Sequence, residues 1–501
     1  MELAQIDIGS HLADAAHAAD AADDESIVDL RNVFTAQRTA FLRDGIPTAK
    51  TRIDRINRAI GLLIEHKRAI CEAMSADFSS RAHEQTLLLD VYAAIEQLKY
   101  NRKHLGSWMK PERRGANFPL NLLGARAEIH YQPKGVIANV GPWNFPVQAA
   151  FGPLAPMLAA GNRVMIKVSE LTPRTAELCR TMIASKFDVA EVAVVCGGPD
   201  LGAALAELPF DHIFFTGSTR VGRLVLRAAA ANLTPVTLEL GGKSPAIIAE
   251  DADLALAAYR IAWAKLLNSG QICVTADYAL VPESRLGAFI AAYQRAVARL
   301  YPTLRDNPDY TAMISDQHRS RVLAYVEEAR SKGVEIIEIN AAREDFTGSA
   351  ARKIAPMLAI NPGDDCRLMQ EEIFGPVLPV KTYRDLGEAL NYINARPRPL
   401  GLYIFGGKEP ADRVLSSTIS GGAAVNDIGV QVLQENLPFG GSGNSGMGNY
   451  HAEFGFKTFS HARAVYRGIH ADPLAVLRPP FTKHTRRVLE FLTGGSRAGR
   501  S

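Results

Sequence analysis

Two short segments of this 501-residue chain carry residue types that together could perform covalent chemistry on a carbonyl compound. Cys273 ends the run Asn268-Ser-Gly-Gln-Ile-Cys273. Glu239 is separated from the glycines 241–242 by a single leucine. A cysteine thiolate can attack a carbonyl carbon, and a carboxylate can activate the water that later cleaves the covalent intermediate. The two segments therefore predict one nucleophile and one general base.

The surroundings of Cys273 favour a reactive thiol, although a lone cysteine is more often a small buried hydrophobic residue. Gly270 lets the backbone approach closely, and Asn268, Ser269 and Gln271 are unusual neighbours for a core cysteine. A free thiol has a pKa of about 8.5, so only a small part of it is thiolate at pH 7, and nearby positive charge or a helix N-terminus could raise that fraction.

Glu239 lies between Leu238 and Leu240 at the end of an apolar strand. Alternation along the strand leaves two possibilities for its carboxylate, which either faces the surface or is held in a pocket. Burial in a pocket would raise its pKa towards the value of a useful base.

Two turns after expected strands carry groups that could bind a ligand. Gly141-Pro-Trp-Asn-Phe-Pro146 contains Asn144, which could donate an amide hydrogen bond to an oxyanion, but a turn with Pro and Asn is also common. Phe215-Thr-Gly-Ser-Thr-Arg-Val-Gly222 is a strand, a turn and a helix start, where free N–H groups could bind a nucleotide pyrophosphate. An ordinary glycine turn explains the second pattern equally well.

Composition is that of an ordinary soluble globular protein, with 47% hydrophobic and 22% charged residues. The net charge of +3 gives no reason to expect nucleic acid as a partner. Five widely spaced cysteines signal neither a disulfide framework nor a metal site, and a cytoplasmic location fits best. We expect no signal peptide, and no membrane span because the longest apolar stretch, near 149–161, is interrupted by prolines.

Strands and helices alternate from residue 135 onwards, which predicts an α/β fold with parallel, doubly wound sheets. Expected strands lie at 135–140, 163–167, 191–195, 212–215, 245–249, 278–281, 378–382, 402–405 and 423–426, and expected helices at 147–160, 173–186, 253–267, 284–299 and 317–331. Residues 29–107 have helical spacing, and 111–134 suggest an extended arm. Residues 1–25 are expected to be disordered or loosely helical.

Seven segments in one order resemble the aldehyde dehydrogenase superfamily over residues 30–465. They are Gly141-Pro-Trp-Asn-Phe-Pro146, Lys167-Val-Ser-Glu170, Phe215-Thr-Gly-Ser218, Leu238-Glu-Leu-Gly-Gly-Lys243, Gly270-Gln-Ile-Cys273, Glu371-Glu-Ile-Phe-Gly-Pro376 and Pro438-Phe-Gly-Gly441. Leu233-Thr-Pro-Val-Thr-Leu-Glu239 and Gly443-Asn-Ser-Gly-Met-Gly448 resemble the class 3 branch, and the pattern is nearest to the bacterial coniferyl aldehyde dehydrogenases. Val168 departs from the proline that is usual in the family.

The resemblance implies a role for each matched residue. Cys273 would be the nucleophile, Glu239 the base for deacylation, and Asn144 the oxyanion donor together with the backbone N–H of Cys273. The implied cofactor-binding residues are Trp143, Lys167, Glu170, Gly217, Ser218, Gly222, Leu240, Glu372 and Phe374. The cofactor would be NAD, with NADP as the alternative, and no metal is implied.

The resemblance also implies a Rossmann-type cofactor domain at 26–235 with the arm 111–134 inserted, and a catalytic domain at 236–440. Residues 441–470 would return to the cofactor domain and supply an oligomerisation strand, and 471–501 would be a tail. The arm would complete the sheet of a neighbouring subunit, which gives a homodimer or a tetramer.

The expected activity is NAD(P)-dependent oxidation of an aldehyde to its carboxylic acid through a thiohemiacetal and a thioester. The expected substrate is an aromatic aldehyde like coniferyl aldehyde, and the alternative is a medium- or long-chain aliphatic aldehyde. Two other classes stay open, a cysteine thioesterase or hydrolase without redox chemistry and an inactive structural homologue.

Overall fold

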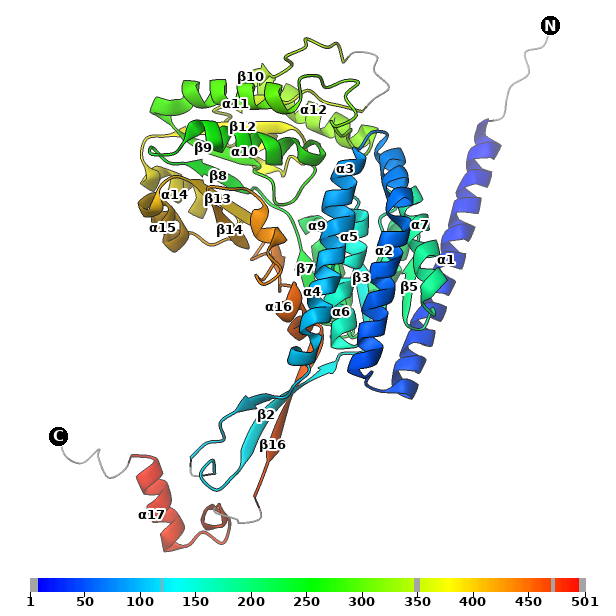
Figure 1. Ribbon diagram of the computed structural model, residues 1–501, viewed down its shortest axis with the longest axis vertical. Helices are drawn as coiled ribbons and strands as arrows, with labels where there is room; N and C mark the ends of the chain where they lie inside the picture. The colour runs from blue at the N-terminus through cyan, green and yellow to red at the C-terminus, as the bar shows by residue number, and fades with distance from the viewer. Residues whose placement is uncertain (1–7, 119, 347–351, 470–473, 495–501) are drawn as a thin grey trace, which may run out of the picture.

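The computed structural model describes residues 8–118, 120–346, 352–469 and 474–494, with side chains from residue 26 onwards. Two α/β lobes lie side by side, and a thin arm projects from the body (Figure 1). In the described part of the chain, no helix is long and apolar enough to span a bilayer.

The first lobe is built on a six-stranded sheet in the order β15-β7-β6-β3-β4-β5. All neighbouring strands are parallel except the short β15, which pairs antiparallel with β7. The strands are β3 (Val136–Val140), β4 (Arg163–Lys167), β5 (Val192–Val195), β6 (His212–Thr216), β7 (Val236–Glu239) and β15 (Gly446–Met447). The strands at 135–140, 163–167, 191–195 and 212–215 are thus confirmed to within about a residue.

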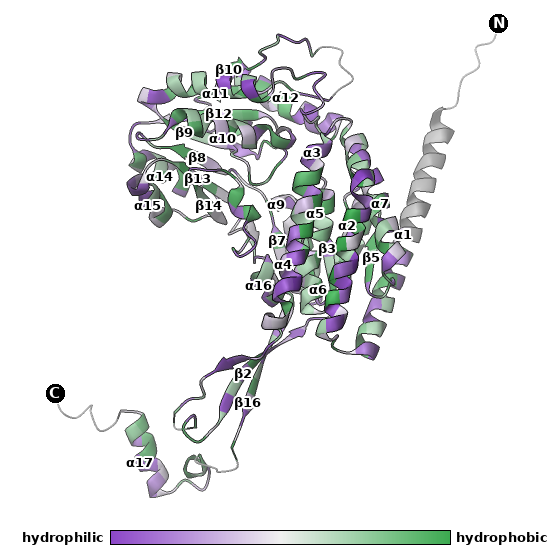
Figure 2. Ribbon diagram, in the orientation of Figure 1, coloured by the Kyte–Doolittle hydropathy of each residue, from purple (hydrophilic) through white to green (hydrophobic). Residues whose placement is uncertain are grey.

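Helices cover both faces of this sheet. They are α1 (Ile8–Asp44), α2 (Ala49–Phe78), α3 (His83–Thr86), α4 (Ala93–Trp108), α5 (Pro146–Phe151), α6 (Leu154–Ala160), α7 (Pro173–Lys186), α8 (Pro199–Glu207), α9 (Thr219–Ala230) and α16 (Ala452–Thr458). A π-helical turn, Leu87–Tyr92, joins α3 to α4. Hydrophobic and hydrophilic residues alternate along α2 and α4 (Figure 2), as expected for helices with one buried face.

The prediction of a single helix at 147–160 is wrong, because the structure has two helices there, α5 and α6. Pro153 stands between them and has no N–H to continue the helical hydrogen-bond ladder.

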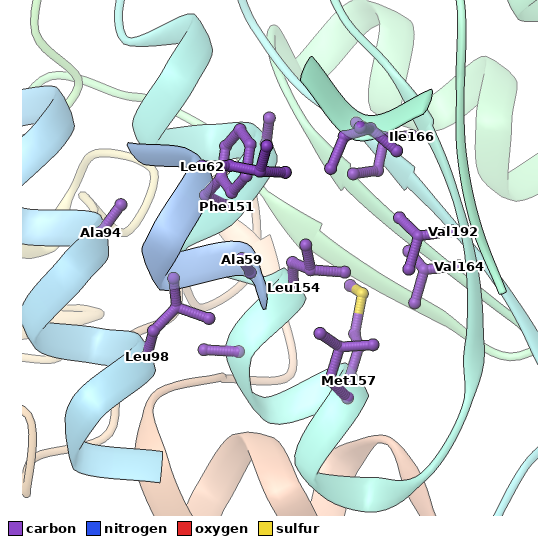
Figure 3. Close-up of a cluster of buried hydrophobic side chains, with 14 of the residues drawn as sticks. Ala59, Leu62, Ala94, Leu98, Phe151, Leu154, Met157, Val164, Ile166 and Val192 are labelled. Carbon is purple, nitrogen blue, oxygen red and sulfur yellow. The ribbon is translucent and has the colours of Figure 1, made fainter. Parts of the chain in front are cut away.

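The core of the first lobe packs helices against the sheet. Figure 3 shows Leu62 of α2 and Leu98 of α4 on one side of α5 and α6, and Val164 and Ile166 of β4 on the other. Burying one such side chain stabilises the fold by about 1.5–3 kcal/mol. This core holds the carboxyl ends of the parallel strands in fixed relative positions.

The second lobe is a seven-stranded sheet in the order β10-β11-β12-β9-β8-β13-β14, parallel except for β10. The strands are β8 (Pro245–Ile248), β9 (Tyr278–Pro282), β10 (Glu335–Glu338), β11 (Met357–Ile360), β12 (Val377–Tyr383), β13 (Gly401–Phe405) and β14 (Gly422–Val425). The helices are α10 (Leu254–Leu266), α11 (Leu286–Leu300), α12 (Asp316–Ser331), α13 (Arg367–Gln370), α14 (Leu386–Asn394) and α15 (Lys408–Ser417), with short 3-10 turns at Leu267–Gly270, Glu283–Arg285 and Val430–Leu433. The chain leaves the first sheet after Glu239 and enters the second at Pro245.

The arm is a separate three-stranded antiparallel sheet in the order β1-β2-β16. Its strands are β1 (Glu112–Arg114), β2 (Arg126–Pro133) and β16 (Ser460–Arg467). A 3-10 turn, Ala475–Leu477, and helix α17 (Lys483–Leu492) follow at the far end (Figure 1). The backbone of residues 8–25 is the first part of α1, while residues 1–7 and 495–501 of the two expected tails lie outside the described residues.

Candidate active site

The expected site residues gather where the parallel strands of the first sheet end. The segment 141–146 follows β3, Lys167 ends β4, Gly217 follows β6 and Glu239 ends β7. The sheet reverses its winding between β3 and β6, and ligands of doubly wound sheets bind at such a point, beyond the carboxyl ends of the strands.

Cys273 follows a strained loop after α10. Asn268, Ser269 and Gly270 have φ values of 49°, 52° and 75°, which is the left-handed region. A Cβ on Gly270 would lie 2.3 Å from the carbonyl oxygen of Gly375, so only glycine fits there. Non-glycine residues in this region cost about 1–3 kcal/mol each and persist only where the surroundings hold them.

Hydrogen bonds to a neighbouring loop hold this strained backbone. Gln271 is fully buried, its Nε2 donates to the carbonyl oxygens of Asn268 (2.9 Å) and Ala312 (3.1 Å), and its Oε1 accepts from the N–H of Ile314 (2.9 Å). Ser269 donates to the carbonyl oxygen of Thr311. The polar neighbours of Cys273 that drew attention in the sequence are therefore the anchors of its loop.

A cavity of about 490 Å³ contains the side chains of all three expected catalytic residues, Cys273, Glu239 and Asn144. The volume lies in the range of about 300–1,000 Å³ that is usual for small-molecule sites. Most of its wall is apolar or aromatic, from Leu88, Leu89, Tyr92, Phe145, Trp263, Leu267, Val430, Val432, Leu433, Phe439 and Tyr450.

The protein surroundings of Cys273 do not raise its thiolate fraction in the way that nearby positive charge could. Burial, and then the carboxyl groups of Glu372 and Glu239, raise its pKa to about 12. The N–H groups of Cys273 and Val274 act in the opposite direction and favour the thiolate. The thiol is therefore protonated at rest.

Glu239 is held in the pocket, which settles the choice that its strand position left open. It is 2% exposed, and neither carboxyl oxygen has a hydrogen-bond partner among the described residues. Burial raises its pKa well above the ordinary value and so favours the protonated form. A buried carboxyl group without partners is expensive to maintain and is typical of an acid–base catalyst.

Asn144 is 4% exposed and its Nδ2 donates to the carbonyl oxygen of Gln271 at 3.0 Å, which leaves one amide hydrogen for a ligand. Its backbone oxygen accepts from Arg81 Nη1 (2.7 Å). Arg81 also donates to Asn268 Oδ1 (3.2 Å) and forms a fully buried ion pair with Asp90 (2.8 Å). One guanidinium group thus joins the loop of Asn144 to the loop of Cys273.

The part that Arg81 and Asp90 play in the site was not expected from the sequence. Arg81 lies in the loop between α2 and α3 and Asp90 in the π-helical turn, far from the matched segments, and neither belongs to a recognisable motif. Burial raises the pKa of Asp90 to about 6, against the opposing effect of Arg81.

The turn after β6 has the form of a phosphate site. Ser218 is the N-cap of α9, where its hydroxyl accepts from the N–H of Val221 at 3.3 Å. Gly217 donates its N–H to the carbonyl oxygen of Glu239 (3.0 Å), and a Cβ on Gly222 would lie 2.8 Å from a methyl group of Leu240. The free N–H groups at the start of this twelve-residue helix can bind an anion.

Lys167 and Glu170 lie together at the end of β4. The ammonium group of Lys167 is 3.1 Å from Glu170, and Lys167 is buried while Glu170 is exposed. Val168, which departs from the family pattern, is 2% exposed and packs in the core. The valine therefore helps to hold the end of β4 against the core.

Glu372, Phe374 and Trp143 also reach the site. The rings of Trp143 and Phe374 are 5.4 Å apart, edge to face. A Cβ on Gly241 would lie 2.1 Å from Glu372 Oε2, so Gly241 makes room for that carboxyl group. Burial, and then Asp277, raise the pKa of Glu372 to about 8.

A buried charge cluster behind Glu372 was missed by sequence reasoning. Asp277 pairs with Lys243, lies 3.8 Å from the ammonium group of Lys265 and accepts from the N–H of Ile373. Lys243 also donates to the carbonyl oxygens of Leu368 and Glu371. This cluster joins the segment after β7 to the segment that carries Glu372.

The residues present fit a dinucleotide. A capped helix N-terminus for a pyrophosphate follows β6, and a Lys–Glu pair lies at the end of β4, at the carboxyl ends of the same sheet. The carboxyl group of Glu372, from the second lobe, lies against Gly241 just after β7. No cluster of three or more His, Cys, Asp or Glu that could hold a metal ion occurs within the described ranges.

Comparison with known proteins gives the same family throughout. The model of the aldehyde dehydrogenase family matches residues 15–465. A probable coniferyl aldehyde dehydrogenase of Caulobacter vibrioides is 51% identical over 92% of this chain and 96% of its own length. The coniferyl aldehyde dehydrogenase of a Pseudomonas strain is 48% identical over 87% and 90%.

Solved structures agree. The substrate-bound AldH of Staphylococcus aureus superposes with a TM-score of 0.86 and 33% identity, covering 92% of this chain and 99% of its own. A Mycobacterium tuberculosis aldehyde dehydrogenase complexed with NAD+ gives a TM-score of 0.80 at 27% identity, covering 89% and 91%. The chain therefore belongs to the aldehyde dehydrogenase family, and it is an NAD(P)-dependent enzyme that oxidises aldehydes.

Proposed function

We propose that this enzyme oxidises an aromatic aldehyde of the coniferyl type, a cinnamaldehyde with a phenolic hydroxyl and a neighbouring methoxy group. The observation that carries the proposal is the cavity at Cys273, whose walls include the rings of Phe145, Trp263, Phe439 and Tyr450. Flat aromatic rings pack favourably among such side chains. The names of two relatives, at 51% and 48% identity, support the same substrate class.

In the proposed mechanism, Cys273 reacts as the thiolate after its proton has passed to water, and its sulfur attacks the aldehyde carbon while the carbonyl electron pair moves to the oxygen. The free amide hydrogen of Asn144 and the backbone N–H of Cys273 bind the oxyanion that forms, and one such donor is typically worth about 3–4 kcal/mol. Arg81 fixes the position of Asn144 through its backbone oxygen. Bound NAD+ supplies the hydride acceptor and a positive charge that favours the thiolate. Loss of the aldehyde hydrogen as hydride to the bound cofactor would then leave an acyl group on the sulfur.

Glu239 acts in the second half of the proposed reaction. It takes a proton from the water that cleaves the acyl–sulfur bond, and its raised pKa makes it a strong enough base once it is ionised. Because Glu239 is retained, hydrolysis rather than acyl transfer to coenzyme A ends the cycle.

The proposed cofactor contacts follow the strand ends. Ser218 and the N–H groups of α9, with Gly217 and Gly222 leaving room, hold the pyrophosphate. Lys167 and Glu170 hold the adenosine ribose, and Glu372 holds the nicotinamide ribose beside Leu240, Trp143 and Phe374. The carboxylate of Glu170 favours NAD, because it would accept a hydrogen bond from the ribose 2′-hydroxyl. Its ion pair with Lys167 reduces its repulsion of the 2′-phosphate of NADP, so we propose that NADP also binds. The first lobe is then the cofactor domain and the second lobe the catalytic domain.

We also infer a cytoplasmic homodimer or tetramer. All five cysteines are free, as expected in a reducing compartment. The arm projects from the body and ends in β16, most of whose residues are exposed, so its outer edge is suited to add to the sheet of a second subunit.

The test has two parts. NAD and NADP reduction is measured with coniferyl aldehyde, cinnamaldehyde and octanal, and the aromatic aldehydes should exceed octanal in kcat/KM by at least about tenfold.

Acid-trapped enzyme is then digested for mass spectrometry, which should find the acyl group on Cys273. Cys273→Ala should form no NADH, whereas the matched control Cys196→Ser should keep activity. A preference for octanal would favour the aliphatic alternative. An adduct on another side chain would contradict the proposed mechanism with Cys273 as nucleophile.

A further inference from the structure

The cavity at Cys273 has a second polar group that the reaction does not use. Glu435, in the turn after the 3-10 helix Val430–Leu433, lines the same cavity, and so do Glu96 and Gln97 of α4. This group of three side chains contrasts with the largely apolar wall around it.

Tyr450 lines the same cavity as Glu435 and the catalytic residues. The charges of Glu239, Cys273 and Glu435 all act on its hydroxyl group. One cavity therefore reaches both Cys273 and Glu435, and Tyr450 is part of its wall.

Glu435 has an oxygen without a partner. Its Oε2 is buried and makes no hydrogen bond to a described residue, and the side chain of Gln97 lies near the carboxyl group. Burial, and then the nearby Glu96, raise the pKa of Glu435 to about 8. At neutral pH the carboxyl group is thus largely protonated, and it can both accept and donate a hydrogen bond.

The two polar neighbours of Glu435 are already engaged. Glu96 pairs with Lys99 at 2.9 Å, and Gln97 Nε2 is 3.1 Å from His451 Nε2. The Oε1 of Gln97 also lacks a partner, but it is packed against Gly152, where a Cβ would lie 2.3 Å away. Glu435 is therefore the group of the three best placed to receive a ligand.

We propose that Glu435 is a specificity-determining residue, whose Oε2 accepts a hydrogen bond from the phenolic hydroxyl at the end of the substrate remote from its aldehyde. The inference rests on the proposed function and names the substrate feature that the cavity selects. A ligand without this hydroxyl leaves the buried oxygen unpaired, and sites built to bind a hydroxyl discriminate strongly against analogues that lack it. The neighbouring methoxy oxygen suits the donor face of the same carboxyl group.

The test compares three aldehydes in four proteins. The aldehydes are coniferyl aldehyde, its phenolic methyl ether and unsubstituted cinnamaldehyde. The proteins are the unaltered enzyme, Glu435→Leu, Glu435→Gln and the control Asn436→Leu, whose site is the adjacent exposed residue. The readout is the ratio of kcat/KM for coniferyl aldehyde to kcat/KM for each analogue.

Glu435→Leu should lower both ratios by about 10- to 100-fold, mainly through KM, because the hydroxyl is remote from the reacting carbon. Glu435→Gln, which keeps an acceptor, should retain most of the preference, and Asn436→Leu should retain all of it. A merely structural role would lower activity on the three aldehydes equally and leave the ratios unchanged.

The outcomes separate the two proposals. If the unaltered enzyme prefers coniferyl aldehyde and Glu435→Leu keeps that preference, the role of Glu435 is overturned while the substrate class stands. If the unaltered enzyme oxidises cinnamaldehyde or octanal but shows no preference for the phenol, the substrate class fails, and the role of Glu435 fails with it.

Discussion

At the scale of single residues, burial favours the neutral forms of the ionisable groups at this site. The pKa of Cys273 is raised to about 12, that of Glu372 to about 8, and that of Glu239 well above its ordinary value, and burial is the first cause in each case. Neutral groups remove the cost of burying charge, and each becomes charged only when the reaction requires it. Reactivity here depends on what enters the cavity.

Replacement of Glu239 by glutamine should separate the two halves of the reaction. Glu239→Gln should keep a burst of about one NADH per site and lower steady-state turnover by about 10²- to 10⁴-fold, because only thioester hydrolysis needs the base. In the unaltered enzyme, turnover limited by hydrolysis should rise with pH as Glu239 ionises, and the variant should lose that rise. Stopped-flow absorbance across a pH series measures both effects, and normal turnover of the variant would require another base.

The same substitution should raise thermal stability at higher pH. The folded protein holds the proton of Glu239 more tightly than the unfolded chain does, because the pKa is raised in the fold. That contribution to stability is complete below the ordinary pKa and is lost as pH rises through the folded value. The Tm of Glu239→Gln relative to the unaltered enzyme should therefore increase with pH, as calorimetry can show, and a constant difference would contradict the burial of the carboxyl group.

At the scale of elements, one loop after α10 determines where the nucleophile stands. Its three left-handed residues are held by Arg81, by Gln271 and by the loop at 311–314. Because Arg81 also holds the backbone of Asn144, the nucleophile and the oxyanion donor are fixed by one buried guanidinium group. An error of about 1 Å in such a pair can cost about 10²-fold in rate.

Gly270→Ala should therefore abolish the NADH burst. The new methyl group would lie 2.3 Å from the oxygen of Gly375 at a φ of 75°, so the loop must move and carry Cys273 with it. Gly287→Ala in α11 is the matched control, because nothing lies within 4 Å of its Cβ position, and it should keep full burst amplitude. Circular dichroism should find both variants folded, and a normal burst from Gly270→Ala would show that the loop tolerates displacement.

At the scale of the whole molecule, the arm is the part that we propose to carry the assembly. It is tied to the body through β2 and β16, which come from distant parts of the sequence and pair over eight residues. Helix α17, which carries both hydrophobic and basic residues, follows at its far end (Figure 2). A thin sheet of this kind gains stability by pairing with another sheet edge.

The mass of the enzyme in solution should be two or four times the 54.3 kDa of the chain. Strand addition by the arm gives closed, symmetric assemblies of these sizes. Multi-angle light scattering measures the mass at several protein concentrations. A concentration-independent mass of one chain would contradict the proposed assembly.

Much of this architecture could be predicted from the sequence, for identifiable reasons. Near-continuous apolar runs such as 163–167 and 212–215 indicate strands buried on both faces, and the alternation with helices requires a parallel sheet. The glycines near Glu239 and Cys273 marked where the backbone must approach another group. The short helices α13 and α14 and the edge strand β10 were not predicted, because segments of four to nine residues contain few repeats of any pattern.

The sequence by itself determined the order of the strands along the chain and the identity of the residues with chemical potential. Only the tertiary structure decided that Glu239 faces the cavity, that burial outweighs any activation of Cys273, and that Arg81, Asp90, Asp277 and Glu435 belong to the site. The physical reason is that pKa values and unpaired oxygens depend on the three-dimensional surroundings of a group. Those surroundings come from segments as far apart as residues 81 and 435, and local sequence pattern does not specify them.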